Sequence, residues 1–240
     1  MTAGEIFGLL LDYSYLLIFL AFIVTLIAQV RVSTTFSKYS RIPCHSGITG
    51  AEAAELVLSQ NGVRGVRIER VSGHLSDHYD PRSHTIRLSP EVYDRPTSAA
   101  VGVAAHEAGH AVQHAQSYAF FRVRMAIIPV TSYMSRATFP LLLMGLVFDM
   151  LALTTIGTAF IYLAIFTFTF SVIFQLVTLP CEYNASRRAV RAIEGSGRFS
   201  PADAEGARRV LSAAAMTYVA ALFMSLVYLL RYIAIASRRR

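Results

Sequence analysis

The sequence predicts a mostly helical integral membrane protein with about four transmembrane helices and a small water-facing α+β module. Its composition is too apolar for a water-soluble domain, because 54% of the 240 residues are hydrophobic and only 15% are charged. Long apolar stretches occur at the start, in the middle and at the end of the chain. The segment between the first two stretches instead mixes charges, turn residues and both helical and strand-like patterns.

Residues 1–30 are expected to form an N-terminal transmembrane anchor. The stretch from Ile6 to Ala28 is apolar except for Asp12, and it is long enough to cross the roughly 30 Å hydrocarbon core of a bilayer. A cleaved signal peptide is the alternative. The sequence argues against it, since no Lys or Arg precedes the apolar stretch and the stretch exceeds the about 7–15 residues that are usual in signal peptides.

Two further apolar segments are expected to lie in the membrane. Residues 125–179 are long enough for a transmembrane hairpin that turns near Asp149, and residues 211–240 combine a C-terminal transmembrane helix with a basic tail. Arg136 falls inside the hairpin, where an unpaired charge is costly. It should therefore face protein, water or a lipid headgroup.

Residues 31–124 are expected to form the water-facing module. Thr49-Gly50-Ala51-Glu52 is a capping box that starts a helix, and Asn61-Gly62 is typical of its end. The stretch from Val66 to Val71 alternates like a half-buried strand, and Thr85 to Leu88 is a second strand able to pair with it. We expect Thr85 to Leu88 to be an edge strand that binds an extended peptide, with an ordinary edge strand as the alternative.

The most informative motif of the module is His106-Glu107-Ala108-Gly109-His110. Residues four apart share a helix face, so His106 and His110 can direct ring nitrogens at one Zn²⁺ ion. Glu107 is then placed to act as the general base on a water molecule. This HExxH helix predicts a zincin-like catalytic module and one zinc ion per chain. A pair of hydrogen-bonded core histidines is the alternative.

Catalytic zinc usually takes three protein ligands, so a further donor is expected elsewhere. Glu182 is the candidate for this third ligand. It belongs to residues 180–210, which we expect to form a helix that carries the third ligand and a segment at the membrane surface. Pro180 suits the first turn of a new helix and would place Glu182 in that turn. The alternative is a carboxylate that forms a salt bridge with Arg187 or Arg188.

Four other residues are candidates for supporting roles. The loop from Gly73 to Pro81 is dense in polar groups, and His78 or Tyr79 within it can stabilise an oxyanion, although its composition also suits a plain turn. Asn184 follows Glu182 closely enough to orient a ligand. His114 lies on nearly the same helix face as His106, and we expect it to form a hydrogen bond rather than to bind metal.

Three segments together resemble the YugP-like bacterial membrane zinc metallopeptidases. They are the HExxH motif with its flanks, the Gly73 to Pro81 stretch, and Leu179-Pro180-Cys181-Glu182-Tyr183-Asn184-Ala185-Ser186-Arg187-Arg188. The resemblance, which extends more distantly to HtpX-type membrane proteases, implies that His106, His110 and Glu182 bind zinc and that Glu107 is the base. It also implies a bacterial plasma membrane location. Cys181 departs from the apolar residue expected at its position, which leaves the redox sensitivity of the site open.

The distribution of charge bears on partners and orientation. The net charge of +7 is spread over membrane boundaries without an aromatic or repeat pattern, so anionic lipid is a better partner than nucleic acid. Seventeen Lys and Arg lie in segments 31–124 and 187–209, against four in Arg231 and the tail. The positive-inside rule therefore places the catalytic face in the cytoplasm and both termini outside. The two cysteines, Cys44 and Cys181, are expected to be reduced thiols.

These observations predict an integral-membrane zinc metalloendopeptidase that hydrolyses peptides or membrane proteins. A catalytically silent zinc-containing membrane adaptor is one alternative, and it would need a site closed by four protein ligands. A metal transporter is another, and it would need polar donors along its membrane helices, which contain little beyond Arg136, Gln175 and some hydroxyl groups.

Overall fold

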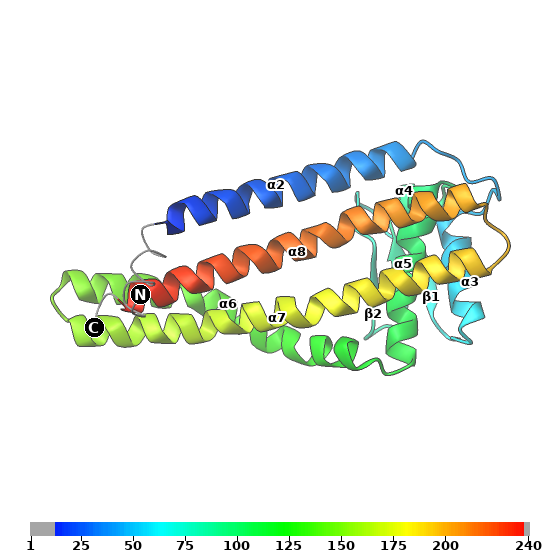
Figure 1. Ribbon diagram of the computed structural model, residues 1–240. Coiled ribbons are helices and arrows are strands. Elements are labelled where there is room, and N and C mark those ends of the chain that lie inside the picture. The colour runs from blue at the N-terminus through cyan, green and yellow to red at the C-terminus, as the bar shows by residue number, and fades with distance from the viewer. Residues whose placement is uncertain (1–12, 238–240) are drawn as a thin grey trace. The chain divides into compact units, whose positions relative to one another are not determined.

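Long helices account for most of the chain (Figure 1). The computed structural model describes residues 13–237, whose elements in chain order are α2 (Ser14–Tyr39), α3 (Gly50–Gln60), β1 (Arg67–Arg70), β2 (His78–Asp80), β3 (Thr85–Leu88), α4 (Pro90–Tyr93), α5 (Ser98–Ala115), α6 (Ala119–Met150), α7 (Thr154–Gly195) and α8 (Pro201–Ser237). The expected mostly helical architecture with a small sheet is therefore confirmed.

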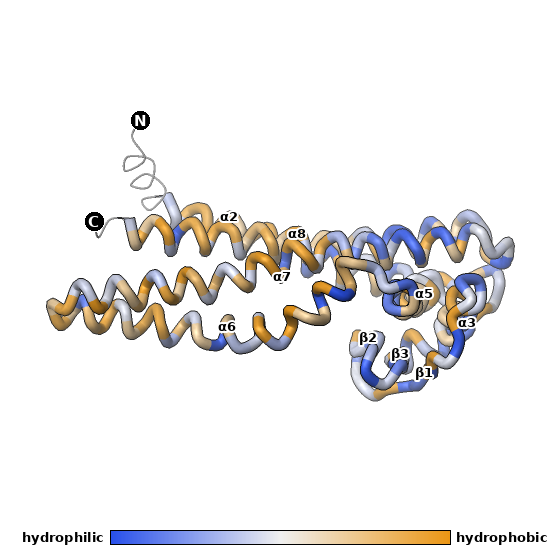
Figure 2. Tube along the Cα trace, turned by 90° about the horizontal axis from the view of Figure 1, so that it is seen from below, coloured by the Kyte–Doolittle hydropathy of each residue, from blue (hydrophilic) through white to orange (hydrophobic). Residues whose placement is uncertain are grey.

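The chain divides into two compact units. The first, called here the helical unit, comprises the described residues of Met1–Ile27, Val123–Thr178 and Tyr218–Arg240. The second, called the mixed unit, comprises Ala28–Arg122 and Leu179–Thr217, and it contains the sheet, α3, α4 and α5. Figure 2 shows apolar residues along α2, α6 and much of α7, whereas hydrophilic residues are frequent on α3 and the strands.

Three of the described helices, α2, α7 and α8, are long and apolar enough to cross a membrane. The sequence predicted about four spans, and α6 is the helix that accounts for the difference. It is long enough at 32 residues, but Pro129, Pro140 and the polar stretch around Arg136 interrupt its apolar sequence. Arg136 is exposed on α6. The predicted N-terminal anchor is described only from residue 13 onward, so Ile6 to Asp12 lie outside the described residues.

Small residues and hydroxyl groups connect the helices of the helical unit. A Cβ atom on Gly157 would lie 2.7 Å from the carbonyl oxygen of Gly145, so α6 and α7 approach too closely there for any side chain. The Oγ1 atoms of Thr138 and Thr167 are 3.0 Å apart in the same pair. α6 ends at Met150 and α7 begins at Thr154, which confirms the turn that was expected near Asp149.

The sheet of the mixed unit has three strands in the order β1-β3-β2. β1 pairs with β3, as the sequence predicted for these two segments, and the two strands are parallel. β2 pairs with β3 in the antiparallel direction. The prediction that Thr85 to Leu88 is an edge strand is wrong, because β3 has a partner on both sides. β1 and β2 are the two edge strands, and β2 lies in a segment whose composition had suggested only a turn.

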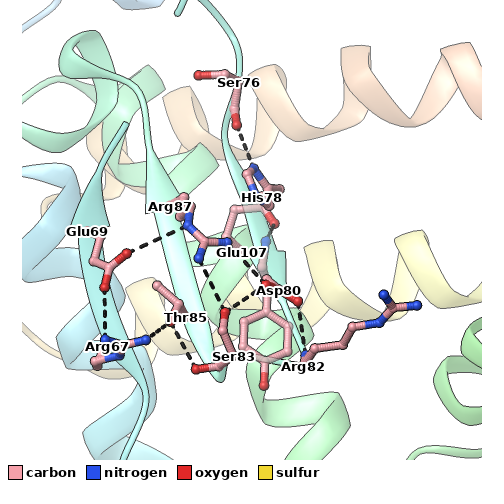
Figure 3. A network of polar contacts seen from close by, with 11 residues as sticks. Arg67, Glu69, Ser76, His78, Asp80, Arg82, Ser83, Thr85, Arg87 and Glu107 are labelled. Atoms are coloured by element: carbon pink, nitrogen blue, oxygen red, sulfur yellow. Dashed lines mark hydrogen bonds and ion pairs between the residues drawn. The ribbon is translucent and has the colours of Figure 1, made fainter. Parts of the chain in front are cut away.

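Polar contacts fix β2 in its place (Figure 3). The Arg87 guanidinium on β3 lies 3.2 Å from the Asp80 carboxylate on β2 and 3.6 Å from Glu69 on β1, so one side chain contacts all three strands. Asp80 also accepts a hydrogen bond of 2.7 Å from the Ser83 hydroxyl. These contacts depend on residues brought together by the turn between β2 and β3, which explains how a strand of three residues persists.

α7 is one continuous helix, which corrects the prediction that a new helix begins at Pro180. Pro180 lies inside the 42 residues of α7, where it removes one backbone hydrogen bond. Prolines are tolerated in this way in long membrane helices, because neighbouring groups satisfy the freed carbonyl. Glu182 therefore lies in the interior of α7 rather than in the first turn of a separate helix.

The predicted helix start at Thr49 is confirmed. Thr49 forms the complete capping box of α3, in which its hydroxyl accepts from the Glu52 amide at 3.3 Å and the Glu52 carboxylate accepts from the Thr49 amide at 2.8 Å. Ser200 and Asp203 make the equivalent exchange at the start of α8, with distances of 3.1 and 3.0 Å.

Thr49→Ala should lower the stability of the mixed unit, because it leaves the Glu52 amide without its acceptor. We expect a loss of about 1 kcal/mol, which corresponds to a fall in melting temperature of about 2–4 °C for a chain of this size. Thermal unfolding of the purified protein in detergent measures the change. Thr49→Ser keeps the hydroxyl group and should melt close to the unmodified protein, and a Thr49→Ala variant that melts at the same temperature would contradict the role of the cap.

Candidate metal centre

Two imidazoles and a distant carboxylate meet in the mixed unit. His106 and His110 lie on α5 with ring centroids 4.7 Å apart, and Glu182 on α7 faces both. The Oε2 atom of Glu182 is 3.1 Å from Nε2 of His106 and 3.6 Å from Nε2 of His110, and the three side chains are 2, 14 and 9% exposed. One ligand atom from each residue lies within 4.8 Å of the others, which is compatible with a single bound metal ion.

A close approach of α5 to α7 makes this meeting possible. A Cβ atom on Gly109 would lie 2.7 Å from the carbonyl oxygen of Ala185, so only glycine fits at that position of the HExxH motif. Ala185 is fully buried at the contact. Because Glu182 lies about one turn before Ala185, the approach brings its short side chain against the imidazoles.

The imidazole rings are oriented by partners on their other nitrogen. Nδ1 of His110 is 3.0 Å from Oε1 of Gln113, and Nδ1 of His106 is 3.1 Å from the Ser186 hydroxyl. An amide oxygen only accepts, so His110 must carry its hydrogen on Nδ1. The Nε2 atoms are then the ones that face Glu182, which is the orientation that metal-binding histidines adopt.

Gln113 connects the two helices of the site, and the sequence-based prediction did not include it. It is completely buried, and its amide nitrogen donates to the Cys181 carbonyl at 2.8 Å and to Oδ1 of Asn184 at 3.0 Å. These two acceptors fix the direction of its amide, so Oε1 faces His110. The available signal was a glutamine three residues after His110 in an otherwise small and apolar helix.

Asn184 and Cys181 belong to the same contact region. Asn184 accepts hydrogen bonds from the Arg188 guanidinium at 2.7 Å and from the Gln113 amide. Among the described contacts it is therefore linked to His110 indirectly, by way of Gln113. The Cys181 thiol is buried 3.3 Å from Oε1 of Gln113. Neither Cys181 nor Cys44 takes part in a disulfide among the described residues.

Glu107, one position along α5 from His106, is held by the edge strand. Its Oε2 atom accepts a hydrogen bond of 2.9 Å from the backbone amide of Tyr79 (Figure 3). Tyr79 pairs opposite Ile86, and its amide points away from β3 toward α5. The carboxylate is half-buried beside the imidazole pair, where a general base would need to be.

Tyr79 and His114 contact each other rather than the metal ligands. The Tyr79 hydroxyl is 2.9 Å from Nδ1 of His114, and burial raises the pKa of Tyr79 to about 12. His114 stacks on His84 at 5.1 Å between centroids, and burial together with that neighbour lowers its pKa. A neutral His114 therefore accepts the phenolic hydrogen, as the predicted hydrogen-bonding role requires.

His78 lies on the other face of β2. Side chains alternate along a strand, so His78 points away from the side that Tyr79 presents. Its Nδ1 atom is 2.8 Å from the Ser76 carbonyl oxygen. Of the two candidate oxyanion donors in this segment, Tyr79 is thus the one on the side of the HExxH helix.

The electrostatics of the centre favour a cation. Burial alone would lower the pKa of His110, but its contacts with Cys181 and the Glu182 carboxylate raise it to about 10. A positive charge is therefore stabilised between Glu182 and the imidazoles, and a divalent cation would take the place of that proton. Two imidazole nitrogens and one carboxylate oxygen are also the donor types that zinc prefers, and three protein ligands leave one coordination position for water or substrate.

Fold, site and sequence together define the class of this protein. The chain belongs to the family described as "Putative neutral zinc metallopeptidase", whose model matches residues 14–237. It is 43% identical over 208 residues to the "Putative membrane protease YugP" of Bacillus subtilis (strain 168), and the alignment covers 87% of this chain and 89% of that protein. The resemblance inferred from the three segments is confirmed. No solved structure matches the chain.

Gln113→Leu should weaken zinc binding by about 10–100-fold, because the substitution removes the acceptor of the His110 ring and the bonds from α5 to α7. Gln113→Glu keeps an acceptor for His110 and should recover part of the affinity. Competition against a chelator of known zinc affinity measures the difference. The control is Gln60→Leu, which makes the same substitution at an exposed position on α3 and should leave the zinc affinity unchanged. Unchanged zinc affinity in a folded Gln113→Leu protein would exclude a positioning role.

Proposed function

We propose that this protein is an integral-membrane zinc metalloendopeptidase. His106, His110 and Glu182 hold one Zn²⁺ ion per chain, and Glu107 is the general base. The observation that carries the proposal is the convergence of Glu182 with both imidazoles, because these residues lie 76 and 72 positions apart in the sequence and have no reason to meet in a purely structural helix pair. Family membership supports the choice of zinc and of peptide hydrolysis.

The reaction needs a nucleophile, a base and a polarised carbonyl. Zinc, when bound, acidifies a water molecule and polarises the peptide carbonyl as a Lewis acid. Glu107 takes the proton of the attacking water and passes it to the departing amine. The Tyr79 amide holds the Glu107 carboxylate for this role, while Ser186 and Gln113 keep the two imidazoles oriented. Tyr79 remains the candidate for stabilising the oxyanion, since it lies on the side of α5; its hydroxyl would then exchange the hydrogen bond to His114 for one to the oxyanion.

The outer edge of β2 is the proposed binding surface for an extended substrate. β3 is central and closed on both sides, so a peptide that adds to the sheet next to α5 has to pair with β2. Tyr79 directs its backbone groups toward that edge. Its amide already donates to Glu107, which leaves its carbonyl oxygen to pair with a peptide. A peptide on this edge would place its scissile bond beside the catalytic carboxylate. Substrates of this kind include unfolded peptides and exposed segments of membrane proteins.

In the proposed membrane topology, α6 is the fourth span beside α2, α7 and α8. The excess of Lys and Arg in the segments that carry the site places the catalytic face in the cytoplasm and both termini outside. The membrane name of the Bacillus subtilis relative and the three apolar helices support membrane association.

Neither alternative function has an observation in its favour. A closed structural site would need a fourth protein ligand, and the candidate group found among residues 13–237 contains three. A transport route would need a succession of polar donors along the membrane helices, whereas the candidate ligands are gathered in the mixed unit.

Glu107→Gln should retain zinc and lose cleavage by about 10²–10⁴-fold, because the amide binds no proton but leaves the three ligands in place. His110→Ala should lose both zinc and cleavage. The measurement is chelator-sensitive cleavage of an unfolded casein-like substrate by the full chain in detergent, with zinc content determined on the same samples.

Glu55→Gln is the matched control, since it makes the same change of charge at an exposed position on α3. It should leave both zinc content and cleavage unchanged. Full activity of zinc-loaded Glu107→Gln would refute the proposed mechanism, and zinc-loaded protein without any cleavage would favour the adaptor.

A further inference from the structure

A cavity lies next to the candidate metal centre, between the parts of α7 and α8 that belong to the mixed unit. Its volume is about 350 Å³, and none of the three metal ligands lines it. Ser186 does line it, and the hydroxyl of Ser186 is also the group that contacts Nδ1 of His106. The cavity is therefore separate from the metal site, but one of its lining residues, Ser186, contacts the candidate ligand His106 directly.

The lining of this cavity carries net positive charge, because three arginines and one carboxylate, Glu194, line it. Arg187 and Arg191 line it one helical turn apart, both are exposed, and neither has an ion pair among the contacts described for residues 13–237. Arg208 also lines the cavity, but it forms ion pairs with Glu194 and Glu205. Two guanidinium groups that line the same cavity are suited to the oxygens of a phosphate group.

The wall of the same cavity is apolar. Leu211 and Ala215 of α8 are buried and line the cavity together with Val190 of α7. Tyr183 and Ser212 add two hydroxyl-bearing side chains to the lining. A free inorganic anion would leave the apolar wall unused. A ligand with a phosphate group and an attached hydrocarbon chain would contact both parts.

The sequence of α7 places Tyr183 at the expected level of a membrane surface and the two arginines beyond it on the water side. The apolar stretch of α7 ends at Leu179, and at a rise of about 1.5 Å per residue Tyr183 and Arg187 follow about 6 and 12 Å further along. Tyrosine is enriched at the membrane interface, and a long arginine side chain can extend back toward the headgroups. We propose that this cavity binds an anionic phospholipid, with its phosphate between Arg187 and Arg191 and the start of an acyl chain against Leu211.

The test is lipid retention by the purified full chain in detergent, measured by native mass spectrometry with equal amounts of phosphatidylglycerol and phosphatidylcholine of identical acyl chains. The unmodified protein should retain phosphatidylglycerol preferentially. Each basic residue near an anionic lipid contributes about fivefold, so Arg187→Gln with Arg191→Gln should lower the preference by about 25-fold. The measurement needs no peptidase activity, so its outcome is independent of the proposed function.

Two further variants separate a built site from general surface attraction. Arg64→Gln with Arg82→Gln removes the same charge from exposed arginines elsewhere in the mixed unit and should change the preference less than twofold. Ser212→Leu should lower retention without any change of charge, because the larger side chain fills the cavity. An equal loss in the control pair, or no loss in the Arg187 and Arg191 variant, would overturn the proposal. Displacement of the lipid by inorganic phosphate alone would identify a simple anion site instead.

Discussion

The contact between the Glu182 carboxylate of α7 and the imidazole pair of α5 is the interaction on which the rest of the site depends. It places a buried negative charge against two histidines, an arrangement that is stable only when positive charge compensates it. The backbones of the two helices must approach closely for this contact, and Gly109 permits that approach. The glycine of the HExxH motif is therefore as much a packing requirement as the histidines are a chemical one.

Hydrogen bonds around the ligands convert this contact into a defined geometry. Ser186 and Gln113 act on the far side of each imidazole ring, and the amide of Gln113 extends the connection to the α7 backbone. On the opposite side, the Tyr79 amide of β2 holds Glu107. The sheet thus contributes to the site through one backbone group, and the polar contacts of Arg87 with Asp80 and Glu69 serve to keep that group in place.

α7 combines several roles along a single helix. Its apolar part is long enough to cross a membrane, Glu182 follows directly after that part, and Tyr183, Arg187 and Arg191 continue on a neighbouring face. Ser186 belongs both to the orientation of His106 and to the lining of the cavity against α8. A lipid bound in that cavity would consequently lie against a residue that orients a metal ligand, which offers a physical route from membrane composition to the chemistry of the site.

The sequence by itself determined the apolar helices, the capped start of α3 and the HExxH residues, because each of these follows from a local pattern or a short spacing. It offered Glu182 and the pairing of β1 with β3 only as candidates. Only the tertiary structure decided that Pro180 lies inside α7, that β3 is central between β1 and β2, and that Gln113 connects His110 to α7. The physical reason is that these features depend on contacts between segments far apart in the chain. Neither propensity nor periodicity contains information about which partner strand or helix will satisfy a given polar group.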